Sequence, residues 1–281
     1  MVTPRSISAV VVDYRSGEAL AHCVDSLRDN GVTDVIVVDN AESPESERVI
    51  DAGVARIVAT RVNLGYGRGV NRGAALATGD YLIVSNPDII VHEGAVAALV
   101  DYLATHPEVG VAAPRIERPD GSVYPSQRVF PNVALAGAHA LLAPLWPDNP
   151  ATRRYRAARS DGTVEWVSGA FFAMRRVDFE AVGGFDERFF MFAEDMDLCW
   201  RVRERGLGIA AVNGAVVTHA EGLSRRHASR AMLIAHHASA LRFEAYHARG
   251  WRRLLVPVAA VLLGARLAVA LVTTGAATSA E

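Results

Sequence analysis

The chain has 281 residues, of which 51% are apolar and 21% are charged, so it can bury the core of one large domain or of about one and a half ordinary ones. This composition excludes an intrinsically disordered chain and a low-complexity fibre. Two cysteines, Cys23 and Cys199, are too few for a disulfide scaffold or a four-cysteine zinc site. The chain opens without a secretory signal pattern, and we therefore expect a reducing, cytoplasmic setting.

Charge is distributed unevenly along the chain, and all 29 basic residues are arginines. Residues 1–224 hold 21 arginines against 29 acidic residues, whereas residues 225–281 hold eight arginines against Glu244 and Glu281. A basic segment behind an acidic body predicts that the C-terminal part faces an anionic surface. A membrane fits this pattern better than nucleic acid, because a nucleic-acid binder is more often basic over the domain itself.

Strand-like and helix-like segments alternate over the first 115 residues. Apolar, β-branched runs predict buried strands at Ile7–Asp13, Thr33–Asp39, Val54–Ala59 and Tyr81–Ser85. Helical spacing predicts helices at Glu18–Asp29, Ser46–Ala52, Gly69–Ala77 and Glu93–Thr105. This alternation predicts a parallel, doubly wound sheet, which binds ligands beyond the carboxyl ends of its strands. Those ends place Asp13, Asp39 and Asn86–Asp88 along one edge.

The pattern changes after Pro114. Asp120-Gly121 between extended stretches predicts a hairpin or an irregular loop. Further segments then follow in chain order: an apolar helix at Val133–Leu145, a basic loop at Arg153–Arg159, a strand at Val164–Met174 that is interrupted at Gly169, and an amphipathic helix within Phe189–Arg205.

The C-terminal segment predicts two helices, at Ser229–Arg249 and Leu254–Thr274. The second has 21 mostly apolar residues, which is enough to cross a bilayer. Pro257 and Arg266 oppose a span, since a central arginine costs about 2.5–3.5 kcal/mol on insertion scales. With Trp251, Arg252 and Arg253 as an interfacial anchor, we favour a helix that lies in the membrane surface over a true span. A helix buried in a dimer is the third alternative.

Four acidic or imidazole side chains, at three places in the sequence, are candidates for chemistry. Asp88, in Asn86-Pro87-Asp88 after a buried strand, is a candidate ligand for Mg²⁺ or Mn²⁺ under a diphosphate, or else a helix cap in a turn. Glu194 and Asp195 follow an aromatic run at a helix start, which suits a tuned general base; alternatively they complement the helix dipole. His219 ends a strand-like segment and is either a metal ligand or a structural histidine.

The segment Asn63–Arg72 (NLGYGRGVNR) is rich in glycine and opens a helix. It follows the third predicted strand rather than the first, so a nucleotide-binding loop remains possible whereas a Rossmann dinucleotide site does not.

The order of these motifs resembles glycosyltransferase family 2: VVVDYRSG, VIVVDN, NLGYGRGVNRG, LIVSNPD, VSGAFFAMRR and GGFDERFFMFAEDMDLCWR, followed by a histidine after a strand. The runs DGSVYPSQRVFPN, WPDNPATRRYR and AHHASALRFEAYHARGWRR are similar to the rhamnosyltransferases of actinobacterial cell-wall linker synthesis within that family.

The family resemblance implies a GT-A fold, with a mostly parallel nucleotide-binding sheet flanked by helices. It implies a glycosyltransferase domain over residues 1–224, with a nucleotide-sugar half (1–115) and an acceptor half (116–224), followed by membrane-associating helices at 225–281. It also implies an inverting, metal-dependent transfer of L-rhamnose from dTDP-β-L-rhamnose to a GlcNAc-diphospho-polyprenol at the cytoplasmic face of the plasma membrane. Alternatives are another donor, such as a UDP-hexose or UDP-galactofuranose, and a catalytically silent nucleotide-sugar-binding scaffold.

The resemblance also implies residue roles. Asp195 would be the general base, with Glu194 beside it, and Asp88 and His219 would hold the metal. Nucleotide-sugar contacts would come from Asp13, Tyr14, Asp39, Asn40, Asn63, Gly65, Asn71, Trp166, Ser168 and Gly169. Two departures from the family pattern stand out: its Thr-Tyr-Asn is Asp13-Tyr14-Arg15 here, and its Asp-x-Asp is Asn86-Pro87-Asp88, which leaves one carboxylate for the metal.

Overall fold

The computed structural model describes residues 5–41, 46, 54–130, 142, 146–157, 164–220 and 230–277. The chain divides into two compact units that are interleaved in sequence. Unit 1 comprises Met1–Arg128, Val164–Phe190 and Glu194–Arg226, and unit 2 comprises Val129–Thr163, Met191–Ala193 and His227–Glu281. The boundaries predicted from the sequence, at residues 115 and 224, separate continuous segments, whereas these units alternate along the chain.

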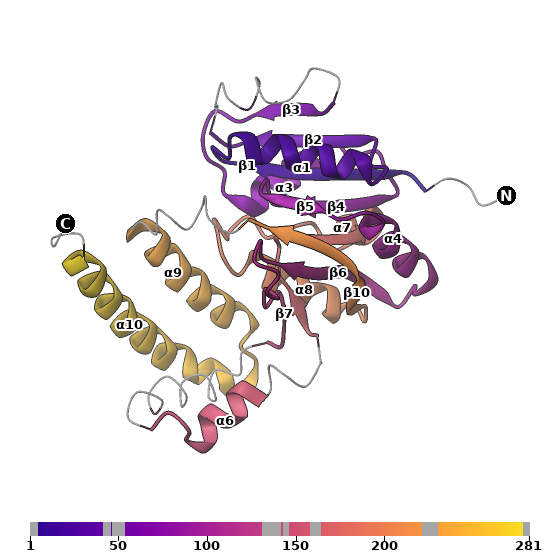
Figure 1. Cartoon of the computed structure of the whole chain (residues 1–281). Helices are drawn as coiled ribbons and strands as arrows, with labels where there is room; N and C mark the ends of the chain where they lie inside the picture. The colour runs from indigo at the N-terminus through magenta and orange to yellow at the C-terminus, as the bar shows by residue number, and fades with distance from the viewer. Residues whose placement is uncertain are drawn as a thin grey trace. The chain divides into compact units, whose positions relative to one another are not determined.

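Unit 1 is built on an eight-stranded sheet of strand order β3-β2-β1-β4-β9-β6-β10-β5 (Figure 1). Its strands are β1 Ile7–Asp13, β2 Asp34–Asp39, β3 Arg56–Ala59, β4 Tyr81–Ser85, β5 Ile89–Val91, β6 Val109–Glu117, β9 Phe171–Arg175 and β10 Gly208–His219. The pairs β1–β2, β1–β4, β2–β3 and β6–β10 are parallel, whereas β9 is antiparallel to β4 and β6, and β5 is antiparallel to β10. A second, two-stranded antiparallel ribbon pairs β7 (Gln127–Arg128) with β8 (Trp166–Val167).

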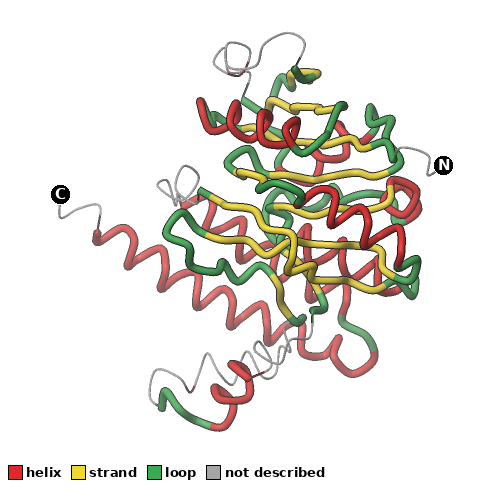
Figure 2. Tube along the Cα trace, turned by 45° about the vertical axis from the view of Figure 1, so that its right-hand side comes forward, coloured by secondary structure: helices red, strands yellow, loops and turns green. Residues whose placement is uncertain are grey.

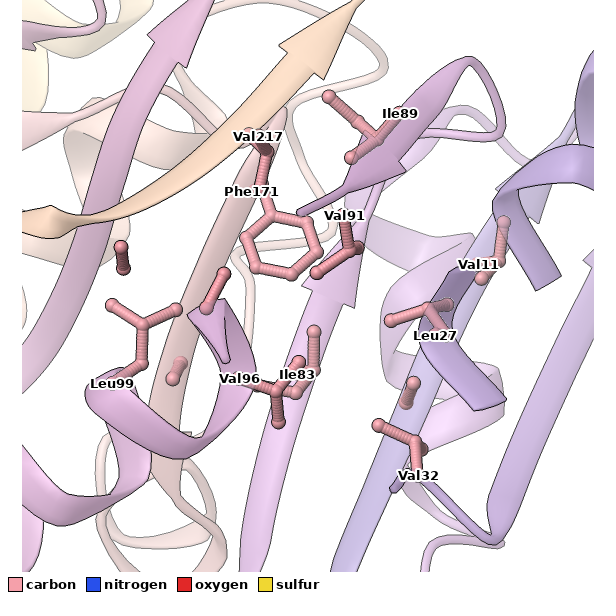
Figure 3. Packing of buried hydrophobic residues seen from close by; sticks show 14 of the residues in the cluster. Val11, Leu27, Val32, Ile83, Ile89, Val91, Val96, Leu99, Phe171 and Val217 are labelled. Atoms are coloured by element: carbon pink, nitrogen blue, oxygen red, sulfur yellow. The ribbon is translucent and has the colours of Figure 1, made fainter. Parts of the chain in front are cut away.

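The main core of unit 1 lies between the sheet and helices α1 (Glu18–Asp29) and α4 (Ala95–Thr105) (Figures 1 and 2). Alternate strand residues, including Val11, Ile83 and Phe171, turn toward Leu27 and Leu99 of these helices (Figure 3). All five side chains are fully buried. This is the alternation expected when each strand presents successive side chains to opposite faces of the sheet.

The opposite face of the sheet receives α3 (Tyr66–Ala74) at close range. A Cβ atom on Gly73 would lie 2.5 Å from Cγ1 of Val10, and one on Gly69 would lie 2.9 Å from Cγ1 of Val12. These glycines therefore let the helix backbone rest directly on the strand side chains. Among the described residues, the unit also contains α7 (Arg176–Ala181) and α8 (Glu194–Glu204), which begins at the two candidate catalytic acids.

Unit 2 contains α6 (Pro150–Ala157), α9 (Arg230–His247), a 3₁₀ segment η2 (Gly250–Leu255) and α10 (Val256–Ala277). Helix α9 packs against α10. The prediction of a loop at Arg153–Arg159 is wrong, because residues up to Ala157 are helical. Asn149 explains the error: its Oδ1 accepts the backbone N–H of Thr152 at 2.9 Å, and Pro150 follows it, which together form a helix start.

Most other predicted elements are confirmed. Strand Ile7–Asp13 and helix Glu18–Asp29 have the predicted ends, and the C-terminal helices lie within a residue or a few of their predicted bounds. The predicted helices Ser46–Ala52 and Val133–Leu145 lie outside the described residues, apart from Ser46 and Leu142.

Candidate active site

The carboxyl ends of β1 and β2 bring two predicted nucleotide contacts together. Asp13 and Asp39 are register partners at the ends of these parallel strands, and both are buried. Asp13 accepts the Ser16 backbone N–H at 3.2 Å and the Ser46 hydroxyl at 2.8 Å, and Asp39 accepts the Ala41 N–H at 2.8 Å. The two acids therefore shape the loops at this edge of the sheet.

Tyr14, which follows Asp13, is exposed, and the Arg15 guanidinium lies 5.5 Å from its ring centroid. Arg15 has a φ of 59°, in the left-handed region that non-glycine residues seldom occupy. The Asp13-Tyr14-Arg15 turn thus projects an aromatic ring and a cation from the strand end, which are groups that suit a nucleotide.

Asn40 and Asn63 hold the start of the glycine-rich segment. Asn40 donates from Nδ2 to the Gly65 carbonyl at 3.0 Å, and Asn63 accepts the Gly65 N–H at 2.9 Å. Gly65 has a φ of 80°, and a Cβ there would lie 2.1 Å from the Phe190 carbonyl oxygen. Only glycine fits this position, which is set by packing against Phe190.

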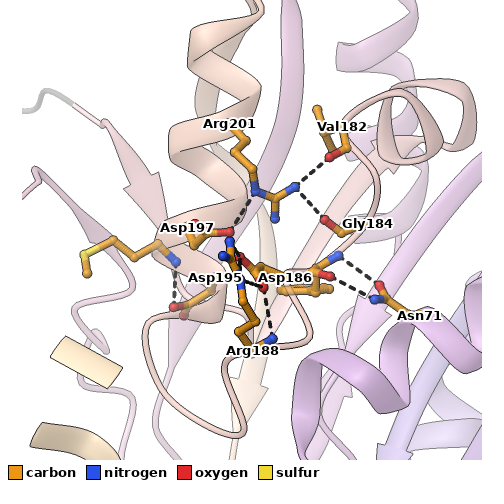
Figure 4. A network of polar contacts seen from close by, with 10 residues as sticks. Asn71, Val182, Gly184, Asp186, Arg188, Asp195, Asp197 and Arg201 are labelled. Carbon is orange, nitrogen blue, oxygen red and sulfur yellow. Dashed lines mark hydrogen bonds and ion pairs between the residues drawn. The ribbon is translucent and has the colours of Figure 1, made fainter. Parts of the chain in front are cut away.

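Asn71 has its amide engaged in protein contacts. Its Nδ2 donates to the Phe185 carbonyl at 2.9 Å and its Oδ1 accepts the Phe185 N–H at 2.8 Å (Figure 4). Arg201 fixes the same loop from the other side, since it pairs with Asp197 at 2.7 Å and donates to the Gly184 carbonyl at 2.7 Å. Through its two hydrogen bonds to Phe185, Asn71 fixes the start of the loop that leads to Glu194.

Asp88 directly precedes β5 and His219 ends β10, and the pairing of these two strands brings their side chains together. Asp88 Oδ1 lies 3.0 Å from His219 Nε2, and the two residues are only 6% and 9% exposed. Nδ1 of His219 is buried and has no hydrogen-bond partner among the residues that the structure describes. The edge of the Tyr124 ring, 5.8 Å away between centroids, faces the imidazole.

A divalent cation fits this pair. Two neighbouring ligands of an octahedral ion bound at about 2.1 Å are separated by about 3.0 Å, and a carboxylate oxygen with an imidazole nitrogen suits Mn²⁺ and is compatible with Mg²⁺. Within the described residues, no cluster of three or more His, Cys, Asp or Glu side chains could hold a metal ion. A cation on Asp88 and His219 would therefore keep positions free for substrate oxygens and water.

Asp195 is held at both carboxylate oxygens by backbone donors. Its Oδ2 accepts the Gly169 N–H at 2.8 Å and its Oδ1 accepts the Met196 N–H at 2.8 Å. The Tyr66 hydroxyl in turn donates to the Gly169 carbonyl at 2.6 Å. A Cβ on Gly169 would lie 3.3 Å from both the Asp195 Cβ and the Tyr66 ring, so glycine is needed for this close approach.

Both adjacent acids are buried, but their hydrogen bonds and neighbouring charges differ. Burial, with the nearby Asp195 charge, raises the pKa of Glu194 to about 8, and Oε2 of Glu194 has no hydrogen-bond partner in the described part of the chain. Burial also raises the pKa of Asp195, but the Gly169 and Met196 N–H groups and the Arg128 guanidinium oppose this shift. The pair therefore favours a protonated Glu194 beside an ionised Asp195, which is the form a general base requires.

Comparison with protein-family models identifies the chain. Residues 8–183 match the model described as glycosyl transferase family 2. The chain belongs to glycosyltransferase family 2. A second model, described as the N-terminal domain of galactosyltransferase, matches residues 156–223.

Curated relatives of this family-2 enzyme include rhamnosyltransferases. The chain is 41% identical over 212 residues to N-acetylglucosaminyl-diphospho-decaprenol L-rhamnosyltransferase of Mycobacterium tuberculosis, which covers 70% of this chain and 69% of the relative. It is 29% identical over 152 residues to the rhamnosyltransferase WbbL of Escherichia coli, which covers 50% of this chain and 56% of that protein. The predicted family is confirmed, and the chain is a glycosyltransferase.

Solved structures show the same fold. The mannosyltransferase PcManGT from Pyrobaculum calidifontis, in complex with GDP-Man and Mn²⁺, matches with a TM-score of 0.62 at 17% identity, over 100% of this chain and 82% of that one. GalNAc-T7 with UDP, GalNAc and Mn²⁺ matches with a TM-score of 0.60 at 16% identity, over 79% of this chain and 45% of that one. The prediction of a GT-A fold with a mostly parallel, helix-flanked sheet is confirmed.

One residue beside the site is absent from the sequence prediction. Arg128, on β7, stacks its guanidinium over the Trp166 ring at 5.2 Å and adds positive charge near Asp195. The sequence gives little indication that Arg128 is a site residue, because single arginines are common between a hairpin and an apolar stretch. The β7–β8 ribbon places it, with Trp166, Ser168 and Gly169, at the start of α8.

Proposed function

We propose that this glycosyltransferase is an inverting rhamnosyltransferase that moves L-rhamnose from dTDP-β-L-rhamnose to a GlcNAc-diphospho-polyprenol. The observation that carries the proposal is the 41% identity, over 70% of the chain, to an enzyme named for that acceptor and that sugar. The arrangement of Asp195, Asp88 and His219 supports it, because an inverting transfer needs one base and a cation site for a diphosphate.

In the proposed reaction, Asp195 takes the proton from the attacking hydroxyl of the acceptor. The hydroxyl oxygen forms a bond to the anomeric carbon of rhamnose while the bond to the dTDP oxygen breaks on the opposite face, so a β-linked donor gives an α-rhamnoside. The backbone N–H bonds from Gly169 and Met196 fix the Asp195 carboxylate in place, so little reorganisation is needed as the proton moves.

Asp88 and His219 would hold a divalent cation, Mg²⁺ or Mn²⁺. When bound, such a cation neutralises the charge that develops on the leaving diphosphate. The nucleoside would bind at the strand ends, in contact with Tyr14, Arg15 and Asp39. The sugar pocket would be lined on one side by Trp166 and Ser168. We also propose that the enzyme works at the cytoplasmic face of the plasma membrane, where its C-terminal helices associate with the lipid surface.

The test is transfer from dTDP-β-L-rhamnose to a short-chain GlcNAc-diphospho-lipid, with Mg²⁺, with Mn²⁺ and with EDTA. We expect metal-dependent product from the native chain, and a loss of about 10³-fold for Asp195→Asn, within the range that general bases contribute. Binding of dTDP should persist in that variant. Asp120→Asn, an exposed carboxylate on the hairpin, is the control and should retain activity.

Product that forms equally well with Asp195→Asn would reject Asp195 as the base. If dTDP binds but no product forms, the donor assignment stands and the acceptor is a different glycolipid. If dTDP fails to bind, a UDP-hexose or UDP-galactofuranose is the donor to test.

A further inference from the structure

Arg128 is held in one orientation by three contacts within unit 1. Its Nε donates to the Pro125 carbonyl at 2.7 Å, and its guanidinium lies 5.2 Å from the Trp166 ring centroid. Its backbone carbonyl accepts the Glu165 N–H at 2.9 Å, as part of the ribbon in which Arg128 and Trp166 are register partners. The two Nη groups are therefore presented in a fixed plane before any substrate arrives.

This preorganised guanidinium forms no ion pair with a carboxylate of the described residues, although its charge acts on Asp195 from farther away. Across the described part of the chain, no carboxylate lies within ion-pair distance of Arg128, whereas Arg175, Arg176 and Arg201 of the same unit each pair with an acid at 2.7 Å or less. A half-buried arginine that is stacked, oriented and unpaired is suited to bind an anion from outside the chain.

The position of Arg128 relates it to the acceptor side of the site. Its register partner Trp166 lies three residues before Gly169, whose N–H binds the Asp195 carboxylate, and the Arg128 charge favours the ionised form of that carboxylate. Asp195 is the proposed acceptor base, whereas Asp88 and His219 are the proposed holders of the donor diphosphate. A guanidinium presents its N–H groups as a planar fork that matches two oxygens of a phosphate.

We propose that Arg128 binds the diphosphate of the lipid-linked acceptor and so selects acceptors whose sugar is attached through a diphosphate. This inference rests on the proposed function, and it adds a specificity determinant to it. The competing explanation is that Arg128 acts only on Asp195, by keeping that carboxylate ionised.

The experiment crosses two changes: Arg128→Gln in the protein, and removal of the diphosphate from the acceptor. A short-chain GlcNAc-diphospho-lipid is compared with a GlcNAc alkyl glycoside of the same chain length. Arg128→Lys keeps the charge without the planar fork. Arg118→Gln is the matched control, because Arg118 also stacks on an aromatic ring, that of Tyr124 at 5.3 Å, but lies in the 117–123 hairpin rather than on the β7–β8 ribbon.

Acceptor binding is measured by calorimetry with the full-length protein, and KM and kcat are measured by transfer. We expect Arg128→Gln to weaken binding of the diphospho-lipid about 10- to 100-fold, as for loss of hydrogen bonds to a charged group, and to leave binding of the alkyl glycoside and of dTDP unchanged. Arg128→Lys should lie between, and Arg118→Gln should match the native chain.

Equal losses with both acceptors, together with an acidic limb of the kcat profile that moves to higher pH, would overturn the proposal in favour of an effect on Asp195. A rise in the donor KM alone would assign Arg128 to the donor diphosphate and also overturn it. If the native chain binds no diphospho-lipid, the proposed function fails. If the native chain and Arg128→Gln bind it equally, only the role of Arg128 fails.

Discussion

Glu194 and Asp195 are neighbours in sequence but differ in what their oxygens meet. Asp195 accepts two backbone N–H groups, and each of these bonds favours the charged form. Glu194 Oε2 is buried and receives no hydrogen bond from the described residues, so a charge there is poorly compensated. One negative charge on the pair therefore resides on Asp195, and its position next to Gly169 fixes where a proton can be accepted.

The burial of Glu194 predicts a pH dependence of stability. Its pKa is about 8 in the folded state against 4.5 for the free group, so well below pH 4.5 it is protonated in both states. Between pH 4.5 and about 8 the unfolded chain loses this proton and the folded chain keeps it, so the free energy of unfolding falls over that window. The Tm of the native chain, relative to that of Glu194→Gln, should therefore fall between pH 4.5 and about 8.

Glu93→Gln, at an exposed position, is the control for this measurement and should leave the pH dependence of the native chain unchanged. If native chain and Glu194→Gln lose stability in parallel from pH 4.5 to 8, Glu194 is ionised in the folded state. The assignment of the proton to Glu194 would then be wrong.

At the scale of elements, the glycines of α3 serve packing. The pattern from Gly65 to Gly73 suggested a nucleotide loop, yet Gly69 and Gly73 lie one helical turn apart on the side that rests on Val10 and Val12. The segment around Gly65 still lies near the strand ends where a nucleotide is expected. In the helix that follows, Gly69 and Gly73 are explained by close packing against the strands.

Gly73→Ala tests this interpretation. The new Cβ would lie 2.5 Å from Val10 and 3.0 Å from Val38, so we expect a loss of about 1–3 kcal/mol in the free energy of unfolding, as for overpacked cores. Binding of dTDP to the folded variant should be unchanged. Gly214→Ala, whose Cβ would meet nothing within 4 Å, is the control. A Gly73→Ala variant of native stability that fails to bind dTDP would contradict the packing role.

Local sequence predicted elements well where one signal dominated. Apolar runs defined β1 and β4, and Gly31, with a φ of 83°, follows the predicted end of α1. The three-residue β5 was missed because it is too short to show a period, and it pairs antiparallel with β10. The antiparallel insertion of β9 between β4 and β6 depends on pairing between distant segments, which no local pattern encodes.

The same limit applies to the site. Each of Asp88, Glu194, Asp195 and His219 was identified from its place at a strand end or helix start. That Asp88 and His219 meet at 3.0 Å follows from the β5–β10 pairing and could not be derived from spacing. Arg128 was missed because its significance comes from the ribbon that stacks it on Trp166.

At the scale of the whole molecule, the chain passes from unit 1 to unit 2 and back just before Glu194 and Asp195, the proposed catalytic acids. Met191–Ala193 belongs to unit 2, where the Ser239 hydroxyl donates to the Met191 carbonyl at 2.8 Å and His236 packs edge-on against Phe192. Phe192 and Ala193 have φ values of 69° and 64°. The next residue is Glu194, so unit 2 holds the strained segment that leads directly into α8.

Unit 2 also has a helical stretch, Gly250–Leu271, whose apolar side chains are largely exposed. Within Gly250–Leu271, the most apolar window of 18 residues has a mean hydropathy of 2.3, and only 6% of that window is buried. Trp251, Leu254, Val258 and Val261 are 53–78% exposed along this stretch. Arg266 is exposed on the same helix, which favours a position in the interface, where an arginine can reach water, over one in the bilayer centre.

We therefore expect the full-length protein to float with vesicles that contain anionic lipid, less strongly at high salt, and to be released by carbonate. Val258→Asp combined with Val261→Asp should reduce the bound fraction at least about tenfold, because two exposed apolar groups on the membrane-facing helix become charged. Val177→Asp, which is 60% exposed on α7 of unit 1, is the control and should bind as the native chain does. Resistance to carbonate would instead establish a membrane span, and a native chain that stays with the soluble fraction would remove the membrane from the proposed function.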